Sequence, residues 1–116
     1  MGWMDDIDDL PEDGPRFFKV CRLEQIPTGS GRIAYASGTR VALFKADGQI
    51  YAVQNLCPHA GASLGVGEFK GLVVTCPRHD WTFNVKTGAC LNKRMYSLRT
   101  FPVEVRQGEV WVQSPG

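Results

Sequence analysis

Two segments of the chain have the pattern of β-hairpins, and they constrain the fold more than any other feature. In "TRVALFKADGQIYAVQN" (39–55), two β-rich runs flank Asp47-Gly48, a pair that favours the positive φ angles of a tight turn. Near the end of the chain, "FPVEVRQGEVWVQ" (101–113) has the same hairpin pattern around Gln107-Gly108. No apolar period of 3.6 residues persists for three turns anywhere. The pattern therefore predicts an all-β protein.

Shorter β-rich runs fill much of the remaining chain. "RFFKVCRL" (16–23) and "RIAYAS" (32–37) are typical of strands, and "LVVT" (72–75) and "WTFNV" (81–85) are short strands between glycine-rich loops. The 13 Gly and 7 Pro residues suit a fold with many turns. We expect one compact antiparallel sandwich or barrel built from both ends of the sequence, with residues about 55–92 as an inserted subdomain.

The charge is distributed unevenly along the chain. Residues 1–13 hold six of the 12 Asp and Glu residues and none of the 13 Lys and Arg residues. The rest of the chain keeps six acids against thirteen bases, a net charge of +7, although the whole chain has only +1. We therefore divide the chain into an acidic N-terminal arm (1–15) and a folded domain (16–113). The arm is either a solvated tail or a segment that binds the basic body or a partner.

Several classes of protein are excluded by the same composition. No run approaches the roughly 18 apolar residues of a membrane helix, and the acidic N-terminus is unlike a secretory signal. We expect a cytoplasmic protein that does not bind membranes. The basic residues are scattered, which argues against nucleic-acid binding. In a reducing compartment, the four cysteines are better explained as metal ligands or packed thiols than as disulfides.

Two loops each combine a cysteine with a histidine. Cys57 and His59 form C-x-H, Cys76 and His79 form C-x-x-H, and these are the only two histidines in the sequence. Such loops could close a four-coordinate zinc site or hold a two-iron cluster from opposite sides. An imidazole nitrogen lies farther from its backbone than a cysteine sulfur, which favours an inner metal held by sulfur and an outer one held by nitrogen. In an extended C-x-H segment, both side chains also project to one side.

The two motifs, in "CPHAG" and "CPRHDWTFNVKTG", resemble those of Rieske [2Fe–2S] proteins, and so does the all-β frame over roughly residues 16–113. The resemblance implies one Rieske [2Fe–2S] cluster per chain, with two inorganic sulfides bridging the irons. It also implies that Cys57 and Cys76 bind one iron and that His59 and His79 bind the other.

Four positions depart from the Rieske proteins of respiratory complexes, which this chain otherwise resembles. Ala62 and Arg78 stand where those proteins add two cysteines that form a disulfide. Trp81 and Phe83 stand where those proteins place serine and tyrosine hydroxyls that donate to cluster sulfurs. Fewer donors stabilise the extra electron less, so we expect a potential near the lower end of the Rieske range, about −150 mV or below. We expect both aromatic side chains to pack beneath the cluster loops, and the alternative is that they directly affect the solvent access of the cluster.

The chain offers no site for substrate chemistry of its own. Once His59 and His79 hold a cluster, no facial triad of two histidines and a carboxylate can form. We therefore expect a one-electron carrier that serves an oxidoreductase.

Two systems could use such a carrier. The motif "CPRHDWTFNVKTG" looks most like the small subunit of assimilatory NAD(P)H nitrite reductase, which implies electron flow from flavin to siroheme on a large subunit that reduces nitrite to ammonia. The alternative is a free Rieske ferredoxin that carries electrons from a flavin reductase to a ring-hydroxylating oxygenase.

The segment "LNKRMYSLRTFP" follows the cluster motifs and contains two adjacent bases. Lys93 and Arg94 are either solvated turn residues or a basic docking rim for an acidic partner, with Met95 or Tyr96 shielding the cluster. The remaining cysteines, Cys21 and Cys90, are expected to be packed side chains and not ligands.

Overall fold

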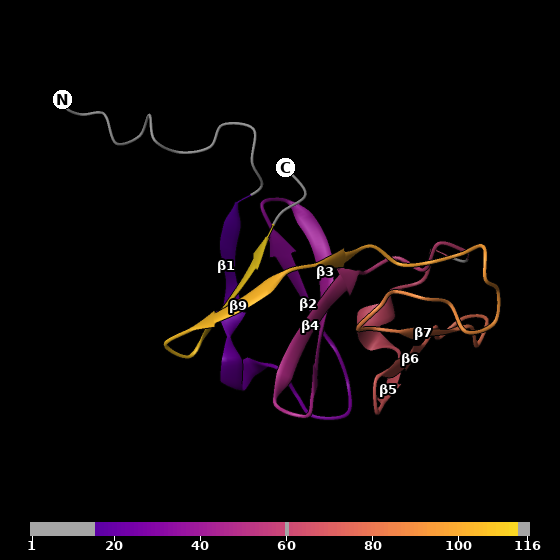
Figure 1. Ribbon diagram of the computed structural model, residues 1–116, viewed down its shortest axis with the longest axis horizontal. Coiled ribbons are helices and arrows are strands. Elements are labelled where there is room, and N and C mark those ends of the chain that lie inside the picture. Colours follow the sequence, from indigo (N-terminus) through magenta and orange to yellow (C-terminus); the bar gives the residue numbers. More distant parts are fainter. Residues whose placement is uncertain (1–15, 60, 114–116) are drawn as a thin grey trace.

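The computed structural model describes residues 16–59 and 61–113 (Figure 1). These residues form ten strands and two short 3-10 helices, which confirms the predicted all-β fold class. The acidic arm predicted over residues 1–15 lies outside the described residues. No helix in the described part of the chain is long and apolar enough to cross a membrane.

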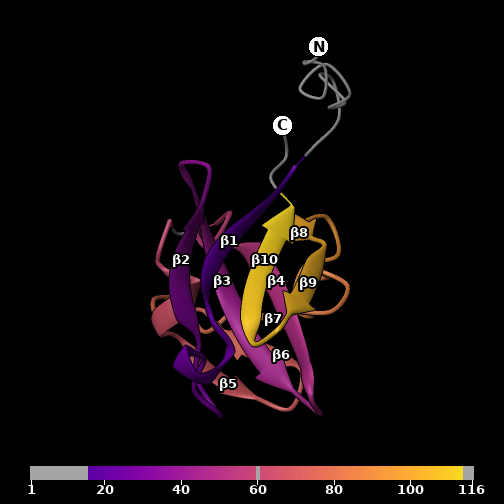
Figure 2. The same ribbon diagram turned by 90° about the vertical axis from the view of Figure 1, so that its left-hand side faces the viewer.

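Three antiparallel sheets contain the strands (Figures 1 and 2). The first sheet has the order β1 (Phe17–Arg22), β10 (Glu109–Gln113) and β9 (Val103–Arg106). The second has the order β2 (Arg32–Ala36), β3 (Thr39–Ala46), β4 (Gln49–Gln54) and β8 (Thr100–Phe101). The third has the order β5 (Glu68–Lys70), β6 (Val73–Thr75) and β7 (Thr82–Asn84). The 3-10 helices are η1 (Leu23–Gln25) and η2 (Leu64–Val66).

Three hairpins turn on pairs of consecutive residues with positive φ, between 50° and 84°: Ser37-Gly38, Asp47-Gly48 and Gln107-Gly108. Two positive φ angles in a row match the right-handed twist of the flanking strands. The turns at Asp47-Gly48 and Gln107-Gly108 confirm the sequence prediction. The third turn was not expected, because the segment 32–37 was interpreted as one strand, whereas β2 ends at Ala36.

Strand β3 has both of its faces buried. Val41 and Leu43 belong to the core shared with the first sheet, whereas Ala42 and Phe44 belong to the core beneath the third sheet. All four side chains are fully buried, and each such Val, Leu or Phe contributes about 1.5–3 kcal/mol of burial free energy. Figure 1 shows the resulting order of layers, with the second sheet between the other two.

The third sheet is inserted in the chain between β4 and β8. Its Phe69 ring packs against Phe44 of β3, with ring centroids 4.7 Å apart. An isolated bridge between Ser30 and Glu68 adds a second link to the first half of the chain. The third sheet is therefore held by packing against β3 as well as by its two chain connections.

Gly88 allows the chain to pass close to the segment that leads into β8. Its amide donates to the Asn84 carbonyl at 2.7 Å, and its carbonyl accepts from the Leu98 amide at 2.7 Å. Its φ is +84°, and an added Cβ would collide with the Leu98 carbonyl. Gly108 has nearly the same φ, +80°, but open space where a Cβ would lie.

We predict that Gly88→Ala lowers the free energy of unfolding more than Gly108→Ala. Both substitutions place a Cβ in a left-handed conformation, at about 1–2 kcal/mol. Gly88→Ala adds a backbone collision, which overpacking data put at about 1–3 kcal/mol. Urea unfolding of both variants measures the difference, and equal losses would show that the close approach at Gly88 is absent.

Candidate metal centre

The two cysteine loops have the same backbone hydrogen bonds. The Cys57 amide donates to the Ala62 carbonyl at 2.9 Å, and the Cys57 carbonyl accepts from the Gly61 amide at 2.8 Å. In the second loop, the Cys76 amide donates to the Trp81 carbonyl at 2.7 Å, and its carbonyl accepts from the Asp80 amide at 3.1 Å. Each loop thus closes over six residues, between the cysteine and the fifth residue after it.

The fifth position of each loop needs a left-handed backbone. Gly61 has φ +70° and its counterpart Asp80 has φ +61°. Aspartate is one of the few residues besides glycine that adopt this conformation without a large penalty. The same turn therefore forms from two different sequences. Residues 58–59 lie in a turn, so the geometry of an extended C-x-H segment does not apply to Cys57 and His59.

The four candidate ligands differ in burial, with both cysteines in the interior and both histidines at the surface. The Cys57 and Cys76 side chains are buried, with 2% and 0% of their surface exposed. His59 and His79 are both exposed, and their ring centroids lie 4.8 Å apart in an edge-to-face arrangement. The structure therefore brings the two predicted histidines together, above two thiols that belong to the core beneath.

One aromatic side chain covers a face of His59, and a second lies close to both rings. The Trp81 ring stacks on His59 with centroids 4.2 Å apart and planes 27° apart. Tyr96 lies edge-on to His59 at 6.4 Å and contacts Trp81 at 5.1 Å. Both Trp81 and Tyr96 are half-buried. No ring contact of His79 with an aromatic residue other than His59 occurs among the described residues.

The expected positions of these aromatic residues are correct only in part. Phe83 is fully buried in the core with Cys57 and Cys76, as expected for a side chain beneath the loops. Trp81 instead lies beside His59 and remains partly exposed. Trp81 packs against the edge of the same core, because its carbonyl closes the second loop and keeps the residue at the loop's edge.

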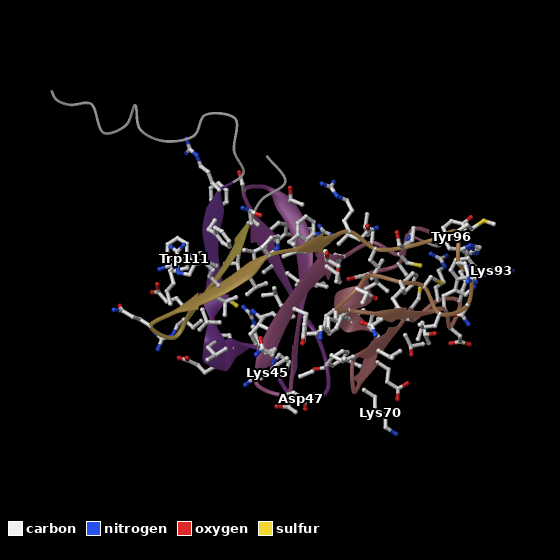
Figure 3. The ribbon with its side chains drawn as sticks, viewed as in Figure 1. Lys45, Asp47, Lys70, Lys93, Tyr96 and Trp111 are labelled. Carbon is white, nitrogen blue, oxygen red and sulfur yellow. The ribbon has the colours of Figure 1, made fainter. Side chains whose placement is uncertain are left out.

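A third loop, residues 90–96, completes this end of the molecule. The Cys90 amide donates to the Tyr96 carbonyl at 3.3 Å, and the Tyr96 amide donates to the Lys93 carbonyl at 3.1 Å. The Asn92 side-chain oxygen accepts from the Thr82 amide at 2.6 Å, which ties the loop to β7. Figure 3 shows Tyr96 and Lys93 at the end of the molecule opposite Trp111. The third loop thus places Tyr96 against the first two loops.

Sequence reasoning gave no role to Asn55, although it precedes the first loop. Asn55 is buried, with 1% of its surface exposed, and its side-chain oxygen accepts from the Gly65 amide at 2.9 Å and the Ser63 hydroxyl at 3.1 Å. These bonds fix the base of the first loop against the start of η2. An asparagine two residues before a loop cysteine was the available signal, but asparagine is usually a surface residue.

The other two cysteines lie outside the pair of loops. Burial raises the pKa of the Cys21 thiol, although the nearby Arg32 guanidinium acts in the opposite direction. Cys21 lies in β1 and belongs to the core of the first two sheets. The Cys90 sulfur is also buried and accepts a hydrogen bond from the Lys93 amide at 3.4 Å. Both residues are packed side chains.

The donor set fits a Rieske [2Fe–2S] group. Such a centre needs two thiolates for one iron and two imidazoles for the other. No three Cys, His, Asp or Glu side chains among residues 16–59 and 61–113 gather around one point that could hold a single ion. The donors instead form a buried pair of thiols and an exposed pair of imidazoles. Paired loops of equal size could hold such a group from two sides.

Comparison with known proteins agrees with the chemistry of the donors. The model of the Rieske-like [2Fe-2S] domain family matches residues 16–113. The ferredoxin CarAc of Metapseudomonas resinovorans is 35% identical over 98 residues, which cover 83% of this chain and 92% of that protein. A ferredoxin component of naphthalene 1,2-dioxygenase/salicylate 5-hydroxylase systems from a Ralstonia species is 33% identical over 92 residues, 78% of this chain and 88% of that protein.

Among solved structures, one from Mycobacterium tuberculosis is described as the small subunit of an NADH-dependent nitrite reductase. It superimposes with a TM-score of 0.82 at 26% identity, covering 90% of this chain and 99% of that chain. The fold, the family match and these relatives identify the cofactor as a Rieske [2Fe–2S] cluster. The chain belongs to the family of Rieske-like [2Fe-2S] domains.

Proposed function

We propose that Cys57 and Cys76 ligate one iron of the cluster and that His59 and His79 ligate the other. The burial of both thiols and the 4.8 Å spacing of the exposed imidazole rings support this assignment. So do the matching backbone hydrogen bonds of the two loops, which fix both cysteines in the same way.

The chain is an electron-transfer protein, as its family match and relatives indicate. When bound, a Rieske cluster accepts and releases one electron. The protein's own residues determine where this exchange occurs. The core beneath the loops excludes water from the cysteine side, whereas the exposed imidazoles of His59 and His79 mark the side that a partner can approach. The edge of these imidazoles is therefore the proposed point of exchange.

We propose that the protein serves as a free ferredoxin that passes electrons from a flavin reductase to a ring-hydroxylating oxygenase. The observation that carries this proposal is the similarity to ferredoxin components of dioxygenase systems. At 33–35% identity, the alignments span 88–92% of those proteins, so this chain matches them over nearly their whole length.

A second candidate is the small subunit of a nitrite reductase. The TM-score of 0.82 to the M. tuberculosis structure supports it, and so does the "HDW" segment (79–81) of the second loop. The sequence identities to two solved nitrite reductase small subunits, 26% and 30%, are lower than the 33–34% to ferredoxin components of dioxygenase systems, so we place this role second.

The two roles differ in what the cell loses without the protein. For a ferredoxin, we predict that a strain lacking the gene grows normally with nitrite as the sole nitrogen source. We also predict that the holoprotein can replace the ferredoxin of carbazole 1,9a-dioxygenase, which is 35% identical to this chain, in an NADH-driven assay with a flavin reductase and the oxygenase of that system, with product measured by chromatography. Cys57→Ser is the matched control and should give no product. Loss of growth on nitrite that ammonium restores would contradict the ferredoxin role and support the nitrite reductase role.

We further predict that Trp81→Ala raises the reduction potential, whereas Trp81→Phe changes it less. The indole excludes water from one face of His59, and solvent access stabilises the more negative reduced form. The expected rise is on the order of tens of millivolts. Spectroelectrochemical titration measures it, and Trp111→Ala is the control because Trp111 lies at the opposite end of the molecule (Figure 3). Equal shifts for Trp81→Ala and Trp111→Ala would refute the shielding role.

A further inference from the structure

The third loop presents three consecutive exposed side chains from a fixed backbone. Lys93, Arg94 and Met95 are all exposed, and Met95 has 83% of its surface accessible. The Lys93 amide donates to the Cys90 sulfur, and the Lys93 carbonyl accepts from the Tyr96 amide. A loop held in this way loses little conformational entropy when another protein binds its tip.

The same end of the molecule has an excess of positive charge. The first loop (57–62) has no charged residue, and the second and third loops contain Arg78, Lys93 and Arg94 against Asp80. All four are exposed. The three loops therefore have a net charge of +2 beside the exposed histidines.

The basic side chains at this end of the molecule form no ion pairs among the described residues, unlike several basic side chains at the opposite end. The ion pairs of the described residues join Lys19 to Glu109, Arg22 to Glu24 and Arg106 to Glu104, on or next to the first sheet. Within the described part of the chain, Arg78, Lys93 and Arg94 have no acidic partner within ion-pair distance. Their charge is therefore available to a second molecule.

Exposed apolar side chains accompany these bases. Met95 and Leu91 (57% exposed) are two of the large apolar side chains that the described surface exposes, and both belong to the third loop and its start. Arginine and methionine are enriched in protein–protein interfaces, where apolar contacts supply affinity and charges steer the approach. A rigid loop with both kinds of side chain, next to the proposed point of electron exchange, has the composition of a docking surface.

We propose that Arg78, Lys93, Arg94 and Met95 form a docking surface for an acidic face of the protein that exchanges electrons with this chain. The proposal rests on the electron-transfer function above and names the chemistry of the partner's surface. The bases attract and orient the acidic face, and Met95 enters an apolar contact once the partners meet. The contact between Tyr96 and Trp81 holds this surface beside His59.

The local charge can be tested without any protein partner. The holoprotein is reduced, and its one-electron oxidation is followed with hexacyanoferrate(III), an anion, and with tris(phenanthroline)cobalt(III), a cation. The ratio of the two rates reports the charge near the cluster and cancels changes in its potential. We expect K93E/R94E to lower the anion-to-cation ratio about tenfold, because electrostatic steering changes association rates by such factors.

The control variant is K45E/K70E, which changes the net charge equally. Lys45 and Lys70 lie on a different side of the molecule from Lys93 (Figure 3). The ratio should change much less in this variant, because salt screens distant charges. Equal changes in both variants, or no change in either, would overturn the proposal.

The partner itself is first recovered from the native lysate with tagged holoprotein. A flavin- or iron-containing protein that co-elutes is identified by mass spectrometry and by its visible spectrum, and its binding to the variants is then measured. We expect recovery by wild-type protein and by K45E/K70E, at least about tenfold weaker binding to K93E/R94E, and release by salt. A zero-length carbodiimide should join Lys93 to an Asp or Glu of that protein.

Two outcomes would overturn the docking surface. One is equal binding of wild-type protein and K93E/R94E. The other is cross-linking of Lys93 only to residues 5–13 of this chain, or to a second copy of it. If the recovered protein is a siroheme nitrite reductase that binds K93E/R94E weakly, the docking surface stands and the ferredoxin role fails.

Discussion

The burial of β3 on both faces is the constraint on which the rest of the structure depends. One face packs against the first sheet, and the other forms part of the core beneath the cysteine loops. A strand in this position cannot move without disturbing both cores. Its partner β4 ends at Gln54, where Asn55 anchors the first loop. The two-sided core thus fixes the point from which the candidate ligands project.

The two loops start from this fixed base and place their cysteines in the core and their histidines at the surface. In each, the cysteine forms both backbone hydrogen bonds that close the turn, so its sulfur stays in the core while the histidine reaches the surface. Trp81 belongs to this system as well, because its carbonyl closes the second loop while its ring covers the histidine of the first. The loops therefore position the candidate ligands, shield one imidazole and leave the other more open through the same few contacts.

Much of the fold was predictable because its signals are local. The pairs at Asp47-Gly48 and Gln107-Gly108 specify tight turns whatever surrounds them, and the Cys and His spacing restricts the chemistry of the donors. The turn at Ser37-Gly38 was missed because Ser37 was included in the β-rich run 32–37, which made the predicted strand one residue too long. The stacking of Trp81 on His59 depends on contacts between two loops far apart in the sequence, which no local pattern encodes. The choice of partner depends on surfaces of another protein, and relatives inform it better than the residues of this chain do.

The central claim is that two histidines and two cysteines hold the cluster asymmetrically, and pulsed paramagnetic resonance of the reduced protein tests it most directly. With histidine labelled by 15N, we expect two imidazole nitrogens to couple to the unpaired electron, and both couplings should change with the label. Cys57→Ser and Cys76→Ser should lose the visible spectrum, whereas Cys21→Ser and Cys90→Ser should keep it. Fewer than two coupled nitrogens, or loss of the cluster on replacing Cys21 or Cys90, would contradict the account.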